Sequence, residues 1–211
     1  MRTTPCTPTL FSILDSNPVA ALYRLALHET AQSIHAPFPT PRLPLNVPYL
    51  VDNLWEWARP EHFPSRRWSV YASPSAEIAR LSGSGEGKDV FVVDIDDPQA
   101  KIVQIPYNDA RLHPDVRALP SLLIECVGRA WLGEAALDER AEIAALWMPG
   151  LSREDMETIL QRPRLASRRG DLLSRIHLWR DARLVDSSQE WPFKEGEVFF
   201  QAQRWRLRCR S

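Results

Sequence analysis

Apolar residues recur at helical spacing near the start of the chain, over residues 19–34. The Ser-Asn-Pro sequence at 16–18 suits a helix cap followed by proline in the first turn. We therefore predict a first helix here and treat residues 1–35 as an N-terminal helical segment. Residues 36–48 carry five prolines, which exclude a helix interior. We expect extended chain there, with at most a short strand over residues 42–47.

The pattern then changes twice within a short distance. Residues 49–59 place apolar side chains on one helical stripe and stop at a proline, which predicts a short helix packed against a sheet. Residues 67–72, RWSVYA, alternate and are rich in aromatic and β-branched types, which favours a strand. Ser73 and Pro74 follow as a helix start. A strand that runs directly into a helix is therefore predicted.

Two further strands are predicted on either side of an Asp-Asp-Pro turn. Residues 82–87 are glycine-rich and read as a flexible loop. The runs DVFVVDI, at 89–95, and KIVQIP, at 101–106, have the composition of strands. Because only a short turn separates them, we expect a β-hairpin or an adjacent strand pair.

Most of the remaining chain has a helical pattern. Residues 121–148 are helical in spacing, and Ser152 with Asp155 forms a capping box for a helix that ends near residue 161. A further helix is expected over residues 168–183. The alternation over residues 195–210 predicts one long terminal strand.

These elements indicate one domain of the α+β class. Neither an internal repeat nor a break in composition divides residues 1–211. Residues 107–185 form its mostly helical part. The strands before and after that part are expected to share a sheet flanked by helices.

Charge and composition narrow the function classes. Lys+Arg of 26 against Asp+Glu of 27 gives a net charge of −1, which disfavours general nucleic-acid binding and attraction to anionic membranes. No uninterrupted apolar run is long enough for a signal peptide or a membrane span. The three cysteines, Cys6, Cys126 and Cys209, lack paired spacing, so we expect reduced thiols. We expect a monomer, cytoplasmic as made or delivered into a target cell without a signal peptide.

Several common motifs are absent. The glycines at 83, 85 and 87 precede Lys88, but Asp89 stands where a phosphate loop needs Ser or Thr, and no strand precedes them. The five histidines and three cysteines show no metal-ligand spacing, so no metal cofactor is expected. A Gly-x-Ser-x-Gly nucleophile motif does not occur.

What remains is an ordered set of polar residues. Arg42 lies on the early extended segment, and Tyr71, Ser73 and Ser75 lie at the strand-to-helix junction. Glu195-Gly-Glu197 precedes the late run VFF. This order resembles the ADP-ribosyltransferase superfamily, whose members present Arg or His from the first core strand, Tyr or Ser-x-Ser from the second and Glu or Glu-x-Glu from a late strand. The resemblance covers residues 40–100 and 190–203.

The resemblance implies a split mixed or antiparallel sheet, with residues 107–185 as a helical insertion. It implies NAD as substrate, with Glu197 stabilising the ribose cation and Glu195 on the same strand face orienting or deprotonating the acceptor. Arg42 would hold the diphosphate. Arg24 is the reserve candidate, set aside because it falls in the predicted first helix.

The resemblance also assigns the cofactor-side residues. Tyr71 would stack on nicotinamide, and Ser73 or Ser75 would contact ribose or fix the strand. Each residue keeps an ordinary alternative: core packing for Tyr71, a helix cap for the serines, and solvent-facing charge for the glutamates and for Arg42. Two residue doublets, Trp55/Trp57 and Arg66/Arg67, are peripheral candidates for lining the cleft, with one tryptophan expected in the core.

The function implied is mono-ADP-ribosylation of a macromolecular acceptor, expected to be a protein, by a bacterial toxin or effector. Two alternatives stay open. One is NAD hydrolysis on the same scaffold, and the other is a non-catalytic protein-binding module of the immunity or adaptor type. The sequence names neither the acceptor nor the modified side chain.

Overall fold

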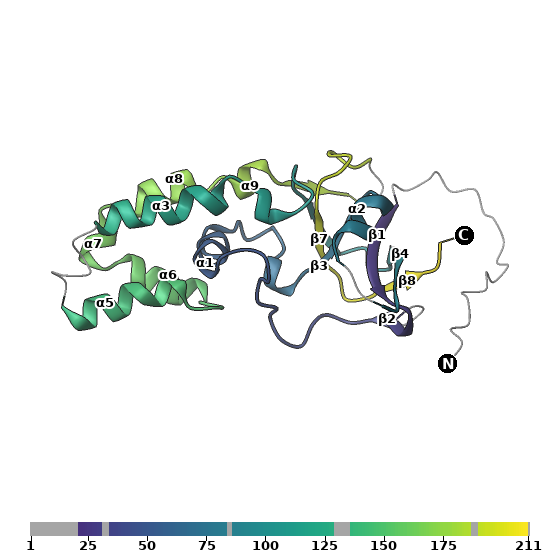
Figure 1. Cartoon of the computed structure of the whole chain (residues 1–211), viewed down its shortest axis with the longest axis horizontal. Helices are drawn as coiled ribbons and strands as arrows, with labels where there is room; N and C mark the ends of the chain where they lie inside the picture. Colours follow the sequence, from purple (N-terminus) through teal and green to yellow (C-terminus); the bar gives the residue numbers. More distant parts are fainter. Residues whose placement is uncertain (1–20, 31–33, 84–85, 129–135, 187–189, 211) are drawn as a thin grey trace.

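The chain folds into two β-sheets and a group of helices arranged in three layers (Figure 1). The computed structural model describes residues 21–30, 34–83, 86–128, 136–186 and 190–210. Sheet A lies at one end, sheet B lies in the middle, and most of the helices lie beyond sheet B. We use the names sheet A and sheet B throughout.

Sheet A is antiparallel in all its pairings. Its spatial order is β1 (Leu22–Leu27), β4 (Lys88–Ile95), β8 (Trp205–Arg208) and β2 (Ile34–His35). Sheet B is antiparallel too, in the order β3 (Val70–Ala72), β7 (Val198–Gln201), β5 (Lys101–Gln104) and β6 (Arg183–Val185). This confirms a mixed helix and strand protein built on antiparallel sheets.

The helices gather on the far side of sheet B, with one exception. Helix α2 (Ala76–Leu81) packs beside β1 of sheet A. The others lie with α1 (Tyr49–Ala58) beyond sheet B and are, in chain order, α3 (Asp115–Val127), α5 (Leu137–Ala144), α6 (Arg153–Leu160), α7 (Pro163–Ala166), α8 (Arg169–Arg175) and α9 (Leu178–Asp181). Short 3-10 turns occur at η1 (His28–Thr30), η2 (Arg66–Trp68), η3 (Ala110–Leu112) and η4 (Ala145–Trp147).

Sheet B separates two hydrophobic cores. On β3 and β7, successive side chains point to opposite faces, as the pleat of a strand requires. Val70 and Phe200 belong to the core between the two sheets. Tyr71 and Phe199 belong to the larger core between sheet B and the helices. One strand therefore presents residues to both cores, and this positions the site described below.

The outer edge of β3 is closed by groups from other segments. The carbonyl groups of alternate residues accept hydrogen bonds: Arg67 from the Arg42 backbone N–H, Ser69 from the Arg42 side chain, Tyr71 from the Arg24 side chain and Ser73 from the Tyr23 backbone N–H. The last of these is half of an antiparallel bridge between Tyr23 and Ser73. Two arginine side chains thus join sheet B to its neighbours where a strand would otherwise be needed.

Several local predictions are confirmed. The helix predicted over residues 49–59 is α1. The helix predicted to start at Ser73 and Pro74 is present as α2 but begins later, with Ser75 as the cap that accepts a hydrogen bond from the Ile78 backbone N–H. Ser152 and Asp155 form the predicted capping box at the start of α6. Each of these signals depends on residues within one helical turn, so it does not need the rest of the fold.

The predicted first helix is wrong in its described part. Residues 22–27 form strand β1, which pairs with β4 over six positions from Leu22↔Val93 to Leu27↔Lys88. The sequence LYRLAL fits the hydrophobic period of a helix and that of a strand. Pairing with a hydrophobic strand favours the strand, because it supplies backbone hydrogen-bond partners and buries Leu22. The cap predicted at residues 16–18 lies outside the described residues. The N-terminal segment is therefore not helical where it is described, apart from one 3-10 turn.

The strand connections also differ from expectation. β4 and β5 do not form a hairpin, because β4 belongs to sheet A and β5 to sheet B. The terminal segment likewise divides into β7 in sheet B and β8 in sheet A. Both crossings lie side by side, since the Asp96 backbone N–H donates to Arg204 O and the Gln203 backbone N–H donates to the Asp97 carboxylate. The interval 42–47 contains no strand, and 168–183 is divided between α8, α9 and the start of β6.

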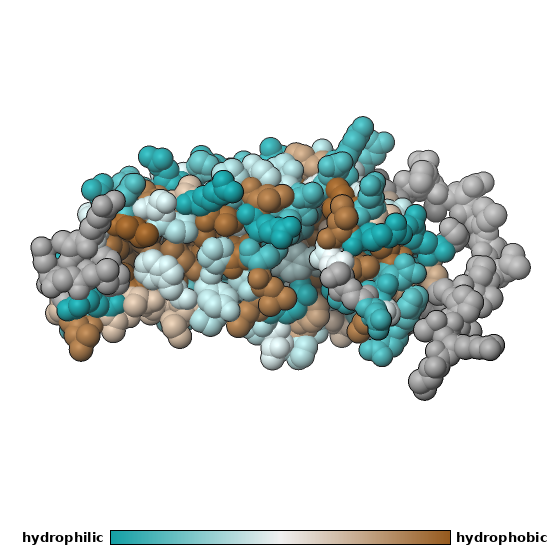
Figure 2. Space-filling view, in the orientation of Figure 1, coloured by the Kyte–Doolittle hydropathy of each residue, from teal (hydrophilic) through white to brown (hydrophobic). Residues whose placement is uncertain are grey.

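Two broader expectations have mixed outcomes. Cys126 is a free thiol, as predicted, but Cys209 is disulfide-bonded, so the prediction of reduced thiols fails there. No described helix combines the length and the apolar character needed to cross a membrane. Hydrophobic residues on the face seen in Figure 2 are interspersed with hydrophilic ones.

Candidate functional site

The candidate site is a cavity of ≈ 560 Å³ that we call the main cavity. Its walls come from β1, the end of β3, the irregular segment 42–47, and residues 108–111. Its lining includes the polar and charged residues Arg24, Arg42, Asp52, Arg66, Tyr71, Ser73 and Glu197. Four of the six residues predicted for the site are among them, together with the reserve candidate Arg24.

Glu197 is held firmly at the base of this cavity. It immediately precedes β7, and its backbone N–H donates to the Tyr107 carbonyl at 2.6 Å. One carboxylate oxygen, Oε1, pairs with Arg66 Nη1 at 2.8 Å. The other, Oε2, accepts a hydrogen bond from the Ala110 backbone N–H at 2.9 Å. Both oxygens therefore have a fixed donor, while the remaining lone pairs can accept from a ligand.

Arg66 is buried, and its guanidinium lies among aromatic rings. The centre of the group is 5.0 Å from the Tyr71 ring, 4.9 Å from the Phe199 ring and 5.7 Å from the Trp55 ring. Burial works against its charge, but the interactions with Tyr71 and Glu197 outweigh burial and hold the pKa of Arg66 above its usual value. The ring faces and the carboxylate together fix the position of this cation.

Two other arginines in the cavity have no acidic partner. Within the described part of the chain, neither Arg24 nor Arg42 forms an ion pair, and their side chains donate to backbone carbonyls of β3 and the residue before it. Burial, together with the nearby charge of Arg42, lowers the pKa of Arg24 to about 10. Arg42 Nε is buried without a hydrogen-bond partner. Two adjacent, poorly compensated cations favour an anionic ligand.

Tyr71 lies between two of these arginines. Its ring is 4.8 Å from the Arg42 guanidinium and 5.0 Å from that of Arg66. Its hydroxyl donates to the Arg66 carbonyl at 2.7 Å. Burial raises the pKa of Tyr71, although the charge of Arg66 opposes this effect. The ring is therefore part of a stack of guanidinium groups, and its hydroxyl is already engaged.

The two predicted serines have different environments. Ser73 lines the main cavity and is fixed by its backbone bridge to Tyr23 and by the Ser75 backbone N–H, which donates to Ser73 Oγ at 3.1 Å. Ser75 does not line the cavity, because its hydroxyl caps α2. The structure therefore brings Ser73 to the site and leaves Ser75 with the alternative role of a helix cap.

Glu195 is exposed and does not line the main cavity. The expectation that it shares a strand face with Glu197 is wrong, because β7 begins only at Val198. The intervening Gly196 is buried so tightly that an added Cβ would lie 2.1 Å from the Ile105 carbonyl oxygen. The chain turns at this point, and the two glutamates diverge.

Arg66 is more central to the site than its sequence context indicates. The sequence makes it only a peripheral candidate, yet it makes the closest side-chain contact to Glu197. A signal is present, since a pair of arginines directly before an apolar strand will be buried only if acids are nearby. Both tryptophans of the other doublet are buried, with Trp55 donating to Asp115 and Trp57 donating to Glu157. Neither lines the cavity.

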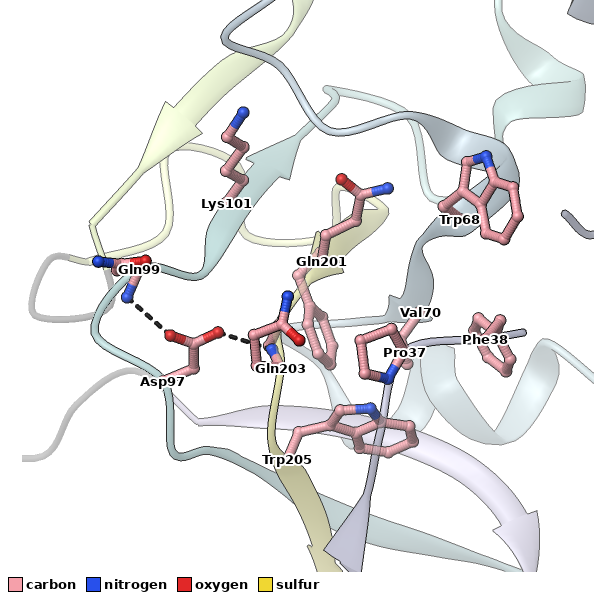
Figure 3. Close-up of a pocket in the computed structure, with 12 residues that line it drawn as sticks. Pro37, Phe38, Trp68, Val70, Asp97, Gln99, Lys101, Gln201, Gln203 and Trp205 are labelled. Atoms are coloured by element: carbon pink, nitrogen blue, oxygen red, sulfur yellow. Dashed lines mark hydrogen bonds between the residues drawn. The ribbon is translucent and has the colours of Figure 1, made fainter. Parts of the chain in front are cut away.

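A second, smaller cavity of ≈ 350 Å³ lies at the corner where the chain crosses between the two sheets (Figure 3). We call it the corner cavity. Aromatic side chains and proline border it on one side, and Asp97, Gln99 and Lys101 lie on the other. The β3 residue Val70 lines this cavity, while its neighbour Tyr71 lines the main cavity.

Comparisons with known proteins give no further guidance. No protein-family model, no curated protein and no solved structure matches the chain. Among the residues that the structure describes, no group of three or more His, Cys, Asp or Glu side chains is placed to hold a metal ion.

Proposed function

We propose that the protein is an NAD-dependent mono-ADP-ribosyltransferase that modifies a protein acceptor, as a bacterial toxin or effector. One observation carries this proposal: Arg24 on β1, Tyr71 and Ser73 at β3, and Glu197 before β7 line a single cavity. They do so in the chain order of the resemblance noted above. On this proposal the two antiparallel sheets are the split sheet of an ADP-ribosyltransferase-like fold, and residues 107–185 are its helical insertion.

Glu197 acts on the ribose attached to nicotinamide. The bond between ribose C1′ and the nicotinamide nitrogen breaks, its electron pair leaves with nicotinamide, and positive charge develops on the ribose ring. A fixed carboxylate beneath the ring stabilises that charge and accepts a hydrogen bond from the 2′-hydroxyl. The acceptor then bonds to C1′ and releases its proton to the solvent. The donors Arg66 and Ala110 N–H keep the carboxylate in place for this step.

Arg24 and Arg42 bind the diphosphate of NAD. Their guanidinium groups lack an acidic partner, and a diphosphate supplies the missing negative charge with oxygens suited to bidentate contacts. Arg24 is the stronger choice, because it lies on the first strand and not in a helix as the sequence suggested. Ser73 contacts ribose from the same wall. Tyr71 is available for ring stacking only on the part of its face that the arginines leave open.

NAD hydrolysis is the second candidate, and the position of Glu195 favours it. The residue expected to activate the acceptor is exposed and outside the main cavity. Water can reach C1′ without that residue. A non-catalytic binding module is the alternative if NAD is not consumed at all.

The test follows labelled NAD with wild-type protein, Glu197→Gln and Glu195→Gln, in separate bacterial and eukaryotic lysates. Free NAD and label on macromolecules are measured together. Gln is chosen because it keeps the side-chain shape and one acceptor oxygen, whereas alanine at 197 would remove both oxygens beside the buried Arg66, at a cost of about 3–5 kcal/mol. Glu190→Gln, another exposed carboxylate before β7, is the matched control.

A transferase labels a protein only when Glu197 is intact. A hydrolase consumes NAD without labelled acceptor, again only with Glu197. Loss of transfer with continued NAD consumption in Glu195→Gln would restore the acceptor role of that residue. If folded wild-type protein leaves NAD unchanged in both lysates, the enzymatic proposal is wrong and the binding module becomes the better interpretation.

A further inference from the structure

The corner cavity is a site that the proposed function does not use. It lies on the opposite face of β3 from Tyr71, at the place where residues 96–100 and 202–204 cross between the sheets. We propose that it binds a nucleoside or a mononucleotide, independently of NAD cleavage in the main cavity.

Trp68 supplies a stacking surface. Its ring borders the cavity and is 39% exposed (Figure 3). In the described part of the chain the Trp68 indole makes no ring contact and its ring N–H donates no hydrogen bond. The buried Trp205, by contrast, stacks on His35 with ring centres 4.2 Å apart. Aromatic side chains left open beside a cavity bind bases through their faces, whatever the base.

Side-chain amides, and a carboxylate that can accept hydrogen bonds from hydroxyl groups, lie opposite this ring. Gln99, Gln201 and Gln203 line the cavity, and amides pair with base edges that place a donor next to an acceptor. The Asp97 carboxylate accepts from the Gln203 and Gln99 backbone N–H groups at 2.6 and 2.9 Å. These bonds lower the pKa of Asp97, which keeps it an acceptor suited to ribose hydroxyls.

Lys101 gives the site a place for one phosphate. It is exposed at the polar side of the cavity, and among the described residues it has no acidic partner. The cavity of ≈ 350 Å³ is near the lower limit for small-molecule sites, so its size suits one base with its ribose better than a whole dinucleotide. Ring, ribose and phosphate are thus each matched by a different wall.

The corner cavity is also connected to the main cavity through two contacts. Phe38 lines the corner cavity, and the Arg42 guanidinium lies over its ring at 4.6 Å. Val70 and Tyr71 are adjacent on β3 and face different cavities. The two cavities therefore share structural supports, although binding in the corner cavity does not require NAD cleavage.

The test is a titration with adenosine and AMP, followed by NMR of the tryptophan indole and backbone N–H signals. Wild type should show saturable shifts centred on Trp68 and on residues 97–101 and 201–203. Trp68→Ala should weaken adenosine by about tenfold or more, since one stacked base contributes roughly that factor, and Trp68→Phe should restore most of it. Trp147→Ala is the matched control, because Trp147 is 38% exposed but lies in the helical layer.

Separate experiments test the phosphate contact and the ribose contact. AMP should bind more tightly than adenosine, and Lys101→Met should remove that difference. Asp97→Asn should reduce the preference for adenosine over adenine. Shifts confined to the main cavity, no saturable shift at millimolar nucleoside, or equal effects of Trp68→Ala and Trp147→Ala would each overturn the proposal. Because binding is read without turnover, a protein that does not cleave NAD can still confirm this site.

Discussion

Arg66 and Arg67 are neighbours that are both buried and that pair with different carboxylates of the main cavity. Arg66 pairs with Glu197 in the main cavity. Arg67 pairs with Asp52 at 2.8 Å and also donates to Asn53 and to the Leu151 carbonyl, so it ties α1 to the segment before α6. Arg67 itself does not line the cavity and does not contact Glu197, so it serves as the matched control for Arg66.

We expect Arg66→Lys to reduce kcat for NAD consumption by about a hundredfold, because small displacements of a catalytic group have effects of this size. The KM for NAD should change little, since Arg66 does not hold the diphosphate. Arg67→Lys should lower the free energy of unfolding by on the order of 1–3 kcal/mol, without changing kcat. Steady-state kinetics and thermal melts of both variants measure this. Equal losses of kcat in the two variants would show that Arg66 acts only through the fold.

Part of the candidate site is predictable from the sequence through the family resemblance described above. That resemblance groups Tyr71, Ser73 and Glu197 in one site, and all three line the main cavity. The choice of Arg42 over Arg24 depended on a helix that is really a strand, yet both arginines reach the cavity. The prediction that Glu195 shares a strand face with Glu197 was wrong, because the packing of Gly196 against Ile105 involves residues far apart in sequence.

At the scale of elements, the turn before β7 decides where Glu197 lies. Gly196 is enclosed by the Ile105 carbonyl, the Phe193 Cβ and the Gln104 side chain, which leave no room for a larger residue. The Gln104 amide bonds to the Phe193 and Gly196 carbonyls and fixes the turn further. The start of the strand is thus set by packing and not by strand propensity.

Gly196→Ala should therefore destabilise the protein by about 1–3 kcal/mol, the usual cost of overpacking. It should also impair NAD consumption, because the displaced turn carries Glu197. Gly170→Ala is the control, since Gly170 lies in α8 with nothing within 4 Å of an added Cβ. That change should leave turnover intact and stabilise by up to about 1 kcal/mol through helix propensity. Chemical denaturation measures the free energy of unfolding of both variants. No loss in Gly196→Ala would show that the turn tolerates a side chain.

The elements that sequence patterns predict well are those with local signals. The caps at Ser75 and Ser152 are read from residues within one turn of each helix. Strand partners are not local: β4 pairs with β1 and β8, and β5 pairs with β6 and β7. Nothing in the Asp-Asp-Pro turn between them reveals that the chain changes sheets there. Period alone could not assign LYRLAL, which becomes a strand because β4 provides its partner.

At the scale of the whole molecule, one histidine connects the site segment with the helical layer. His113 is buried, its Nδ1 accepts from the Asp115 backbone N–H, and its Nε2 lies 3.2 Å from the Asp181 carboxylate. Its ring also packs edge-on against Trp55 and Tyr107. The carbonyl of Tyr107 in turn accepts a hydrogen bond from the Glu197 backbone N–H. Protonation of the His113 ring therefore affects the contacts between the site segment and the helical layer.

Burial lowers the pKa of His113, an effect that nearby His177 adds to and that Asp115 and Asp181 oppose. The unfolded chain then takes up this proton at a higher pH than the folded protein. The stabilising contribution is complete above about pH 6.5, the usual value, and is lost as pH falls toward the lowered folded value. His113→Gln should flatten this part of the pH–stability curve, whereas His62→Gln, at an exposed site, should not. Parallel slopes for both variants and wild type would contradict the assignment.

The arginine-closed edge of β3 has a consequence for the behaviour of the protein in solution. Open strand edges recruit strands from other chains and begin aggregation. Here the carbonyls of Ser69 and Tyr71 are occupied by Arg42 and Arg24, the same side chains proposed to bind NAD. Selection for ligand binding and selection against aggregation therefore act on the same two residues. Variants that lose these arginines should be recovered in poor soluble yield, and a screen for inactive mutants would confuse one defect with the other.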